Sequence, residues 1–178
     1  MGEQKTMTRD DVMRSTLAHV RRVGSLLGDC AFDLIKRANC HDDSKFSPEE
    51  FEAFVEATPR LAGTTYGSDE YRESLKLIRP ALDHHNAHNR HHPEHHADGI
   101  KGMNLLDLIE MLCDWKAATE RHNDGCLTRS IIINAERFGY SPDFARMLWK
   151  TAQSFGWIDP EHEFDDAWAT ATEAVGSS

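Results

Sequence analysis

Residues 81–96 read ALDHHNAHNRHHPEHH and contain seven of the eleven histidines of the chain. Histidine is the commonest metal ligand and normally titrates near neutral pH, so this density indicates chemistry rather than packing. At 100° per residue, one helix face would carry His84, His88, His91 and His95, and a second would carry His85, His92 and His96. Pro93 cannot donate to a helix, so we expect a new turn to start there with His92 just outside it. The alternative is a solvated histidine run that binds metal adventitiously.

The composition is that of a globular protein with an acidic excess. The chain has 178 residues, enough for one domain with or without a tail, and a formal net charge of -10. This charge excludes a general nucleic-acid surface, which needs an excess of Lys and Arg. No apolar run approaches the roughly 18 residues of a membrane span, and the N-terminus lacks the apolar core of a signal peptide. The four cysteines show no CxxC spacing, which favours reduced thiols in a cytoplasmic protein.

Every segment with a clear periodicity is helical, which predicts an all-α fold. N-cap signatures open the expected helices at Thr8, Ser47, Ser68, Asn104, Ser141 and Asp159. The sequence Ser47-Pro48-Glu49-Glu50 predicts a helix start with Glu50 closing a capping box. The isoleucines at 131–133 are ambiguous between strand and helix. We assign 127–138 to a helix because the chain offers no other strand.

Several residues outside the histidine run are candidate partners for it. His19 falls on or beside the apolar face of the first expected helix, where a lone histidine is more often a core residue than a ligand. His41 and Asp42 are adjacent and offer an imidazole and a carboxylate to one cation. Lys45 lies three residues after Asp42. A cation site that includes this pair is therefore one hypothesis for the chain.

Three acidic residues lie on one stripe of the helix that Asn104 opens. Asp107, Glu110 and Asp114 are spaced three and four residues apart, so they project within about 60° of one another. Like charges at this spacing repel by a few tenths of a kcal/mol per pair unless a cation lies between them. A solvated acidic edge is the alternative interpretation.

In chain order, these residues resemble the ligands of the HD superfamily of metal-dependent phosphohydrolases, which run H…HD…D over an all-helical fold. The order here is His19, then His41-Asp42, then His84 or His85, then His91-His92, then Asp114 or Asp107. Residues 41–45, HDDSK, resemble the HDxGK variant with Ser44 in place of glycine. Residues 91–94, HHPE, with Asp98-Gly99, resemble the HHE…DG segment of the branch whose extra histidines bind two or more metals.

The resemblance covers residues 15 to 140 and implies an HD-like bundle of about six to seven helices. The segments HDDSKFSPEE and MNLLDLIEMLCDWKAATERHNDG also resemble an uncharacterised phage and bacterial family of small HD-like proteins. The Gly-Tyr-Pro signature that would follow Asp98-Gly99 is absent, so cyclic-dinucleotide hydrolysis is not implied. We expect a flexible N-terminus over 1–7, an HD-like metal-binding domain over 8–158, and a C-terminal helix with a frayed tail over 159–178.

The resemblance implies divalent transition metal, two ions chosen among Mn, Fe, Co, Ni and Zn. The first ion would be held by His19, His41, Asp42 and Asp114. The second would be held by His84 or His85 with His91 and His92, and Asp42 would bridge the two. His95 of the same run is a further candidate ligand. Asp107 is the alternative to Asp114, which stands nearer to the expected spacing.

Two such ions would activate a water for in-line attack on phosphorus. Lys45, with Asp42, would act in catalysis by stabilising the developing negative charge. Arg121 and Arg129 would bind further phosphate oxygens, and Glu110 would orient a ligand histidine. The implied substrate is a nucleotide or another small phosphoester. An HD-type diiron oxygenase and a non-catalytic metal-binding or interaction module are the alternatives, and the sequence leaves open whether the chain is a homo-oligomer.

Overall fold

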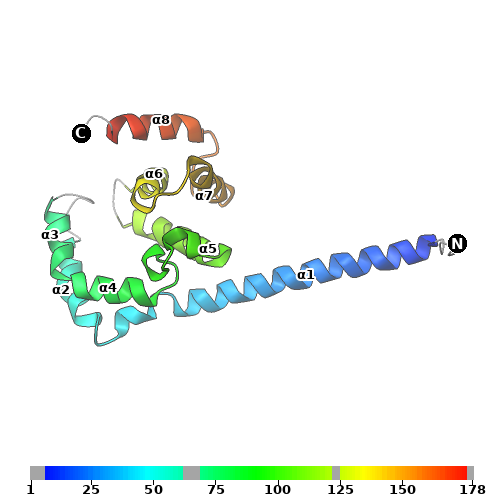
Figure 1. The fold of residues 1–178 in the computed structure, drawn as a ribbon, viewed down its shortest axis with the longest axis horizontal. Coiled ribbons are helices and arrows are strands. Elements are labelled where there is room, and N and C mark those ends of the chain that lie inside the picture. Colours follow the sequence, from blue (N-terminus) through cyan, green and yellow to red (C-terminus); the bar gives the residue numbers. More distant parts are fainter. Residues whose placement is uncertain (1–6, 62–68, 122–124, 176–178) are drawn as a thin grey trace. The chain divides into compact units, whose positions relative to one another are not determined.

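The structure, a computed structural model, describes residues 7–61, 69–121 and 125–175. These residues form eight α-helices and three short 3-10 helices, with no strand among them (Figure 1). The predicted all-α class is therefore confirmed. None of the described helices combines the length and the apolar character needed to cross a membrane. The predicted flexible N-terminus and frayed tail lie outside the described residues, which exclude 1–6 and 176–178. Of these predicted segments only Met7 is described.

The chain divides into two compact units, Met1–Cys40 and His41–Ser178. The boundary falls inside the 8–158 domain expected from the sequence. The first unit contains the single long helix α1, Arg9–Cys40. Thr8 caps it as predicted: the Thr8 hydroxyl accepts from the Asp11 N–H at 3.2 Å, and the Thr8 N–H donates to the Asp11 carboxylate at 3.1 Å. This reciprocal pair satisfies the first turn of the helix.

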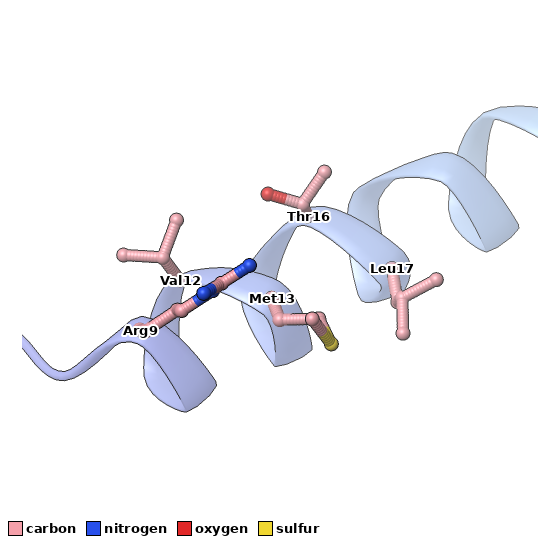
Figure 2. Close-up of a pocket in the computed structure, with 5 residues that line it drawn as sticks. All are labelled: Arg9, Val12, Met13, Thr16 and Leu17. Atoms are coloured by element: carbon pink, nitrogen blue, oxygen red, sulfur yellow. The ribbon is translucent and has the colours of Figure 1, made fainter.

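No residue of α1 is buried, and its apolar side chains lie along an exposed surface. Figure 2 shows an open hollow on this surface near the start of the helix, lined by Arg9, Val12, Met13, Thr16 and Leu17. The hollow contains no histidine, cysteine or carboxylate. It therefore offers no metal ligand, and the candidate chemistry lies in the second unit.

The apolar core of the second unit is built by four helices: α5, Leu105–Thr119; α6, Leu127–Phe138; α7, Pro142–Ser154; and α8, Phe164–Val175. Helix α6 packs against the other three. Ile131 of α6 is fully buried, whereas Ile133 is 45% exposed. That periodicity is helical, so the assignment of 127–138 to a helix is confirmed. The core holds α5, and with it the acidic stripe, in a fixed position.

The histidine run belongs to a second group of elements: η1, Asp43–Phe46; α2, Phe51–Leu61; α3, Asp69–Leu77; α4, Arg79–His88; η2, Pro93–His95; and η3, Gly99–Gly102. Helix α4 packs against η1 and η2. Pro93 begins η2, with His92 just before it in extended conformation, as predicted. The expectation of two continuous helix faces across the run is wrong, because α4 ends at His88 and Asn89 is extended. The turn after α4 folds the later histidines back towards His85.

Candidate metal centre

Asp42 lies at the centre of the candidate site. It precedes η1 and adopts φ 59°, the only positive φ of a non-glycine residue among the described residues. Aspartate tolerates this left-handed conformation better than most residues. Strained backbone of this kind is found disproportionately at functional sites. The turn directs the Asp42 carboxylate into the second unit, where its side chain is 15% exposed.

Three histidines surround the Asp42 carboxylate. Its Oδ1 lies 3.3 Å from Nε2 of His85 and 3.4 Å from Nε2 of His91. Its Oδ2 lies 3.5 Å from Nε2 of His41 and 2.6 Å from Nζ of Lys45. Nε2 of His41 is also 3.8 Å from an oxygen of Asp114. Residues from α4, the turn before η2, η1 and α5 therefore meet at one carboxylate.

Several of these atoms are buried and have no hydrogen-bond partner among the described residues. They are Asp42 Oδ1, His91 Nε2 and His92 Nε2. An unsatisfied buried polar atom costs about 1–3 kcal/mol, so three together would be a large penalty if nothing were bound there. The ring centroids of His91 and His92 lie 4.2 Å apart, and the ring centroids of His85 and His92 lie 4.8 Å apart. Converging lone pairs of this kind are what a bound cation satisfies.

Two overlapping sets of ligands have their donor atoms within 4.8 Å of one another. The first set is His41, Asp42, His91 and Asp114, and the second is Asp42, His85, His91 and His92. Imidazole nitrogens and carboxylate oxygens suit divalent transition metals. Asp42 and His91 belong to both sets, so the residues present fit two neighbouring ions.

Glu110 of α5 fixes the orientation of two ligand histidines. Its Oε1 lies 3.0 Å from Nδ1 of His41 and 3.2 Å from Nδ1 of His91. An ionised carboxylate only accepts hydrogen bonds, so each Nδ1 carries a proton, and Nε2 is the atom of each ring that faces Asp42. A carboxylate behind a ligand histidine is the usual outer partner of a metal site. The sequence prediction that Glu110 orients a histidine agrees with this geometry.

Glu50 makes the equivalent contact to His85 and was missed by the sequence analysis. Glu50 is fully buried, and its Oε2 lies 3.0 Å from Nδ1 of His85. Its Oε1 lies 2.7 Å from Nδ1 of His84, and the Ser44 hydroxyl donates to Oε2 at 3.1 Å. The predicted capping box is therefore wrong, because the Glu50 carboxylate turns inward to these groups. No signal in the sequence distinguishes this glutamate from an ordinary first-turn acid.

The concentration of carboxylates shifts the titration of the site. Hydrogen bonds to Asp114 and Glu110 raise the pKa of His41 to about 10, so that imidazole favours its charged form. Burial opposes ionisation of Asp42, but the adjacent His85 ring and the hydrogen bond from Lys45 outweigh it and hold the pKa of Asp42 well below its usual range. Burial, with the neighbouring His91 and His85, lowers the pKa of His92 to about 3. His92 is thus neutral at physiological pH, as a metal ligand must be.

Comparison with protein families matches residues 8–170 to DUF5662, a family of unknown function. The chain belongs to this family. Neither the curated proteins nor the solved structures give a match. The matched span includes every residue of both ligand sets, so the candidate centre lies within the DUF5662 domain.

The structure of this DUF5662 chain shows which residue of each pair left open by the sequence, Asp107 or Asp114 and His84 or His85, lies beside Asp42. Asp114, not Asp107, reaches the ligand sets. Asp107 is fully buried elsewhere, where Arg90 binds it through two hydrogen bonds of 3.0 and 3.1 Å and it completes the capping box of α5 with Asn104. His85, not His84, faces Asp42.

Several other predicted site residues lie outside the two ligand sets. His84 stacks on His88 with ring centroids 3.9 Å apart, and His95 donates from Nδ1 to the Ala87 carbonyl at 2.7 Å. His19 is exposed on α1, in the other unit, and its role as a ligand stays a prediction. The phosphate-binding roles of Arg121 and Arg129, both exposed, also stay predictions.

Proposed function

We propose that this DUF5662 protein is a metal-dependent phosphohydrolase of the HD type that uses two divalent transition-metal ions. The observation that carries the proposal is the convergence of three buried atoms that have no hydrogen-bond partner in the described part of the chain, Asp42 Oδ1, His91 Nε2 and His92 Nε2. The donor atoms belong to two ligand sets that share Asp42. The HD-like order of these residues in the sequence supports the same assignment.

The ligands divide between the two sets in a definite way. His41 and Asp114 would hold only the first ion, and His85 and His92 only the second. Asp42 can serve both ions through its two carboxylate oxygens, whereas His91 has one lone pair at Nε2 and would hold the second ion. When bound, paired ions supply Lewis acidity and lower the pKa of a coordinated water. The protein's own contribution is to direct Nε2 of each histidine towards the site and to shield part of it from solvent: His85 and His91 are 4% and 2% exposed.

Lys45 provides a positive charge beside the shared carboxylate. Its Nζ lies 2.6 Å from Asp42 Oδ2 and 5.6 Å from the centre of the Phe54 ring, and its side chain is 32% exposed. A partly exposed ammonium at this position can reach a phosphate oxygen of a substrate that approaches from solvent. We propose that Lys45 binds this oxygen and stabilises the charge that develops on it during attack.

The substrate class that we propose is a nucleotide or another small phosphoester. The compartment that we propose is the cytoplasm, because all four cysteines are free thiols and free thiols are typical of reducing compartments.

Phosphate release from a panel of substrates tests the proposal. Protein made without a histidine tag and loaded with Mn²⁺ would be incubated with nucleoside mono-, di- and triphosphates and with p-nitrophenyl phosphate. We expect release of phosphate or pyrophosphate from at least one of them, lost in Asp42→Ala and retained in Asp43→Ala. Asp43 is the matched control because it is exposed on the same short helix, η1.

Two results would replace the proposal. Substrate-dependent oxygen consumption by the Fe²⁺-loaded protein, without phosphate release, would make it a diiron oxygenase. Tight metal binding with neither activity would make it a non-catalytic metal module.

A further inference from the structure

We propose that Glu50 is a positioning residue: together with Ser44 and Asn89, it holds His85 in the tautomer that directs an Nε2 lone pair towards Asp42. This inference rests on the metal function proposed above, and it gives Glu50 no role as a ligand. It assigns to one buried carboxylate the control of one of the two ions.

The contacts of Glu50 assign the proton of His85. Nδ1 of His85 also lies 3.0 Å from the Ser44 hydroxyl and 3.1 Å from Nδ2 of Asn89, but of these neighbours only the Glu50 carboxylate can do nothing but accept. Its Oε2 accepts from the Ser44 hydroxyl at 3.1 Å and faces Nδ1 of His85 at 3.0 Å. A carboxylate cannot donate, so Nδ1 of His85 carries the proton. Because Ser44 donates to Glu50, its oxygen is available to accept from Nδ2 of Asn89 at 2.7 Å. The same Asn89 amide also donates to the His85 carbonyl at 2.8 Å and closes the end of α4.

The burial of Glu50 indicates more than a structural hydrogen bond. Glu50 is 0% exposed, and a buried carboxylate is costly unless several donors compensate for its desolvation. Here three donors do so: Nδ1 of His84, Nδ1 of His85 and the Ser44 hydroxyl. A neutral amide would be cheaper to bury, but it presents one acceptor and one donor and cannot accept at both ends. Only the carboxylate accepts from both histidines and also raises the basicity of a ligand imidazole.

Glu50 and Glu110 divide the ligand histidines between them. Glu110 holds His41 and His91, whereas Glu50 holds His85. His91 belongs to both ligand sets, His41 only to the first, and His85 only to the second. His91 has a single Nε2 lone pair and serves one ion, which we take to be the second. Loss of the Glu50 carboxylate should therefore weaken only the second ion, whereas loss of the Glu110 carboxylate should weaken the first through His41 and the second through His91.

Metal titration of matched variants tests this division. Calorimetric titration with Zn²⁺ would be performed on the wild-type protein and on Glu50→Gln, Glu110→Gln and Glu49→Gln. We expect Glu50→Gln to weaken one equivalent about 10- to 100-fold and to leave the other at wild-type affinity, the size of loss usual for an outer partner of a ligand. Glu110→Gln should weaken both, and Glu49→Gln, an exposed neighbour, should weaken neither.

The tautomer of His85 gives a readout that needs no metal. Long-range ¹H–¹⁵N NMR should show His85 as the Nδ1–H form in the wild-type protein and as a mixture in Glu50→Gln. If Glu50→Gln does not fold, Ser44→Ala replaces it and should weaken the same single equivalent. A folded variant with both equivalents at wild-type affinity, or a wild-type His85 in the Nε2–H form, overturns the inference. Wild-type protein that binds no Zn²⁺ overturns the proposed function instead, and the NMR result then stands alone.

Discussion

The second unit contains two regions that differ in what fills their interior: apolar side chains in one and polar side chains in the other. The core of α5 to α8 is held by apolar contacts, in which Ile131 and Trp149 are almost completely buried. The site around Asp42 is only partly buried and is polar, and it leaves Asp42 Oδ1, His91 Nε2 and His92 Nε2 without hydrogen bonds among the described residues. Protein interiors rarely tolerate such atoms. The core accounts for folding, whereas the atoms of the site would be satisfied by the cation that we propose.

Removal of the Asp42 carboxylate should separate the two regions most sharply. Asp42 belongs to both ligand sets, so Asp42→Ala should abolish turnover and binding of both ions. Helical content should stay at the wild-type level, because no apolar core residue contacts this carboxylate in the interactions described. Metal analysis measures the loss of the ions, and circular dichroism measures the helical content. Wild-type metal content in this variant would make the His41-Asp42 pair structural.

A change in the core should do the opposite. Ile131→Ala removes apolar contacts from a fully buried position and should lower the free energy of unfolding by about 2–5 kcal/mol. Ile133→Ala, on the same helix but 45% exposed, should change it by less than about 0.5 kcal/mol. Urea denaturation measures both. Folded Ile131→Ala should keep its metal, and equal destabilisation by the two variants would contradict the assigned helix face.

Replacement of Lys45 should affect the chemistry without affecting the ligands. Protonated lysine has no lone pair for a metal, so Lys45→Ala should retain its metal. Loss of one charge directed at the transferring phosphoryl group should lower turnover about a hundredfold. Lys101→Ala, exposed on η3, is the control and should keep wild-type turnover. If Lys45→Ala also turns over normally, Lys45 is only the ion-pair partner of Asp42.

The pH dependence of metal binding is the smallest expected effect. The pKa of His41 is about 10 in the metal-free protein, so His41 is protonated at pH 8 and must lose this proton to bind metal. Binding should therefore release a proton, and the affinity should rise with pH until about pH 10. Calorimetry in buffers of different ionisation enthalpy measures the release. A histidine with its ordinary pKa near 6.5 would release almost none at pH 8, which would contradict the raised value.

The sequence predicts the core better than the site, for physical reasons. Helical periodicity determines α5 to α8 locally, the predicted caps Asn104 and Ser141 are confirmed at α5 and α7, and the ambiguous isoleucines at 131–133 follow helical periodicity. The predicted start of the last helix at Asp159 is wrong, because α8 begins at Phe164. The sequence points to histidines of this run as candidate ligands, which stays a prediction, but a continuous helix through the run would not bring His85, His91 and His92 together. The end of α4 at His88 decides instead that His85 meets His91 and His92.

The outer residues of the site are the hardest to predict. Glu50 lies in a strong helix-start sequence, which favours a capping role, yet its side chain contacts His84 and His85, which lie 34 and 35 residues later. Ser44 and Asn89 are likewise 45 residues apart and meet only in the folded unit. Contacts over such separations depend on the packing of α4 against η1, which no local pattern contains. Asp107 is a residue for which a local pattern is misleading. Its place on the acidic stripe indicates a metal ligand, but in the structure its carboxylate forms an ion pair with Arg90.

Metal content of the untagged wild-type protein tests the central claim most directly. After expression in medium supplemented with transition metals, elemental analysis should find more than one equivalent of metal per chain, because the two ligand sets together offer six side chains, Asp42 included. The same analysis of Asp42→Ala gives the background. Less than about a tenth of an equivalent in the wild-type protein would contradict the account, because typical metal centres of this ligand type retain their ions through purification.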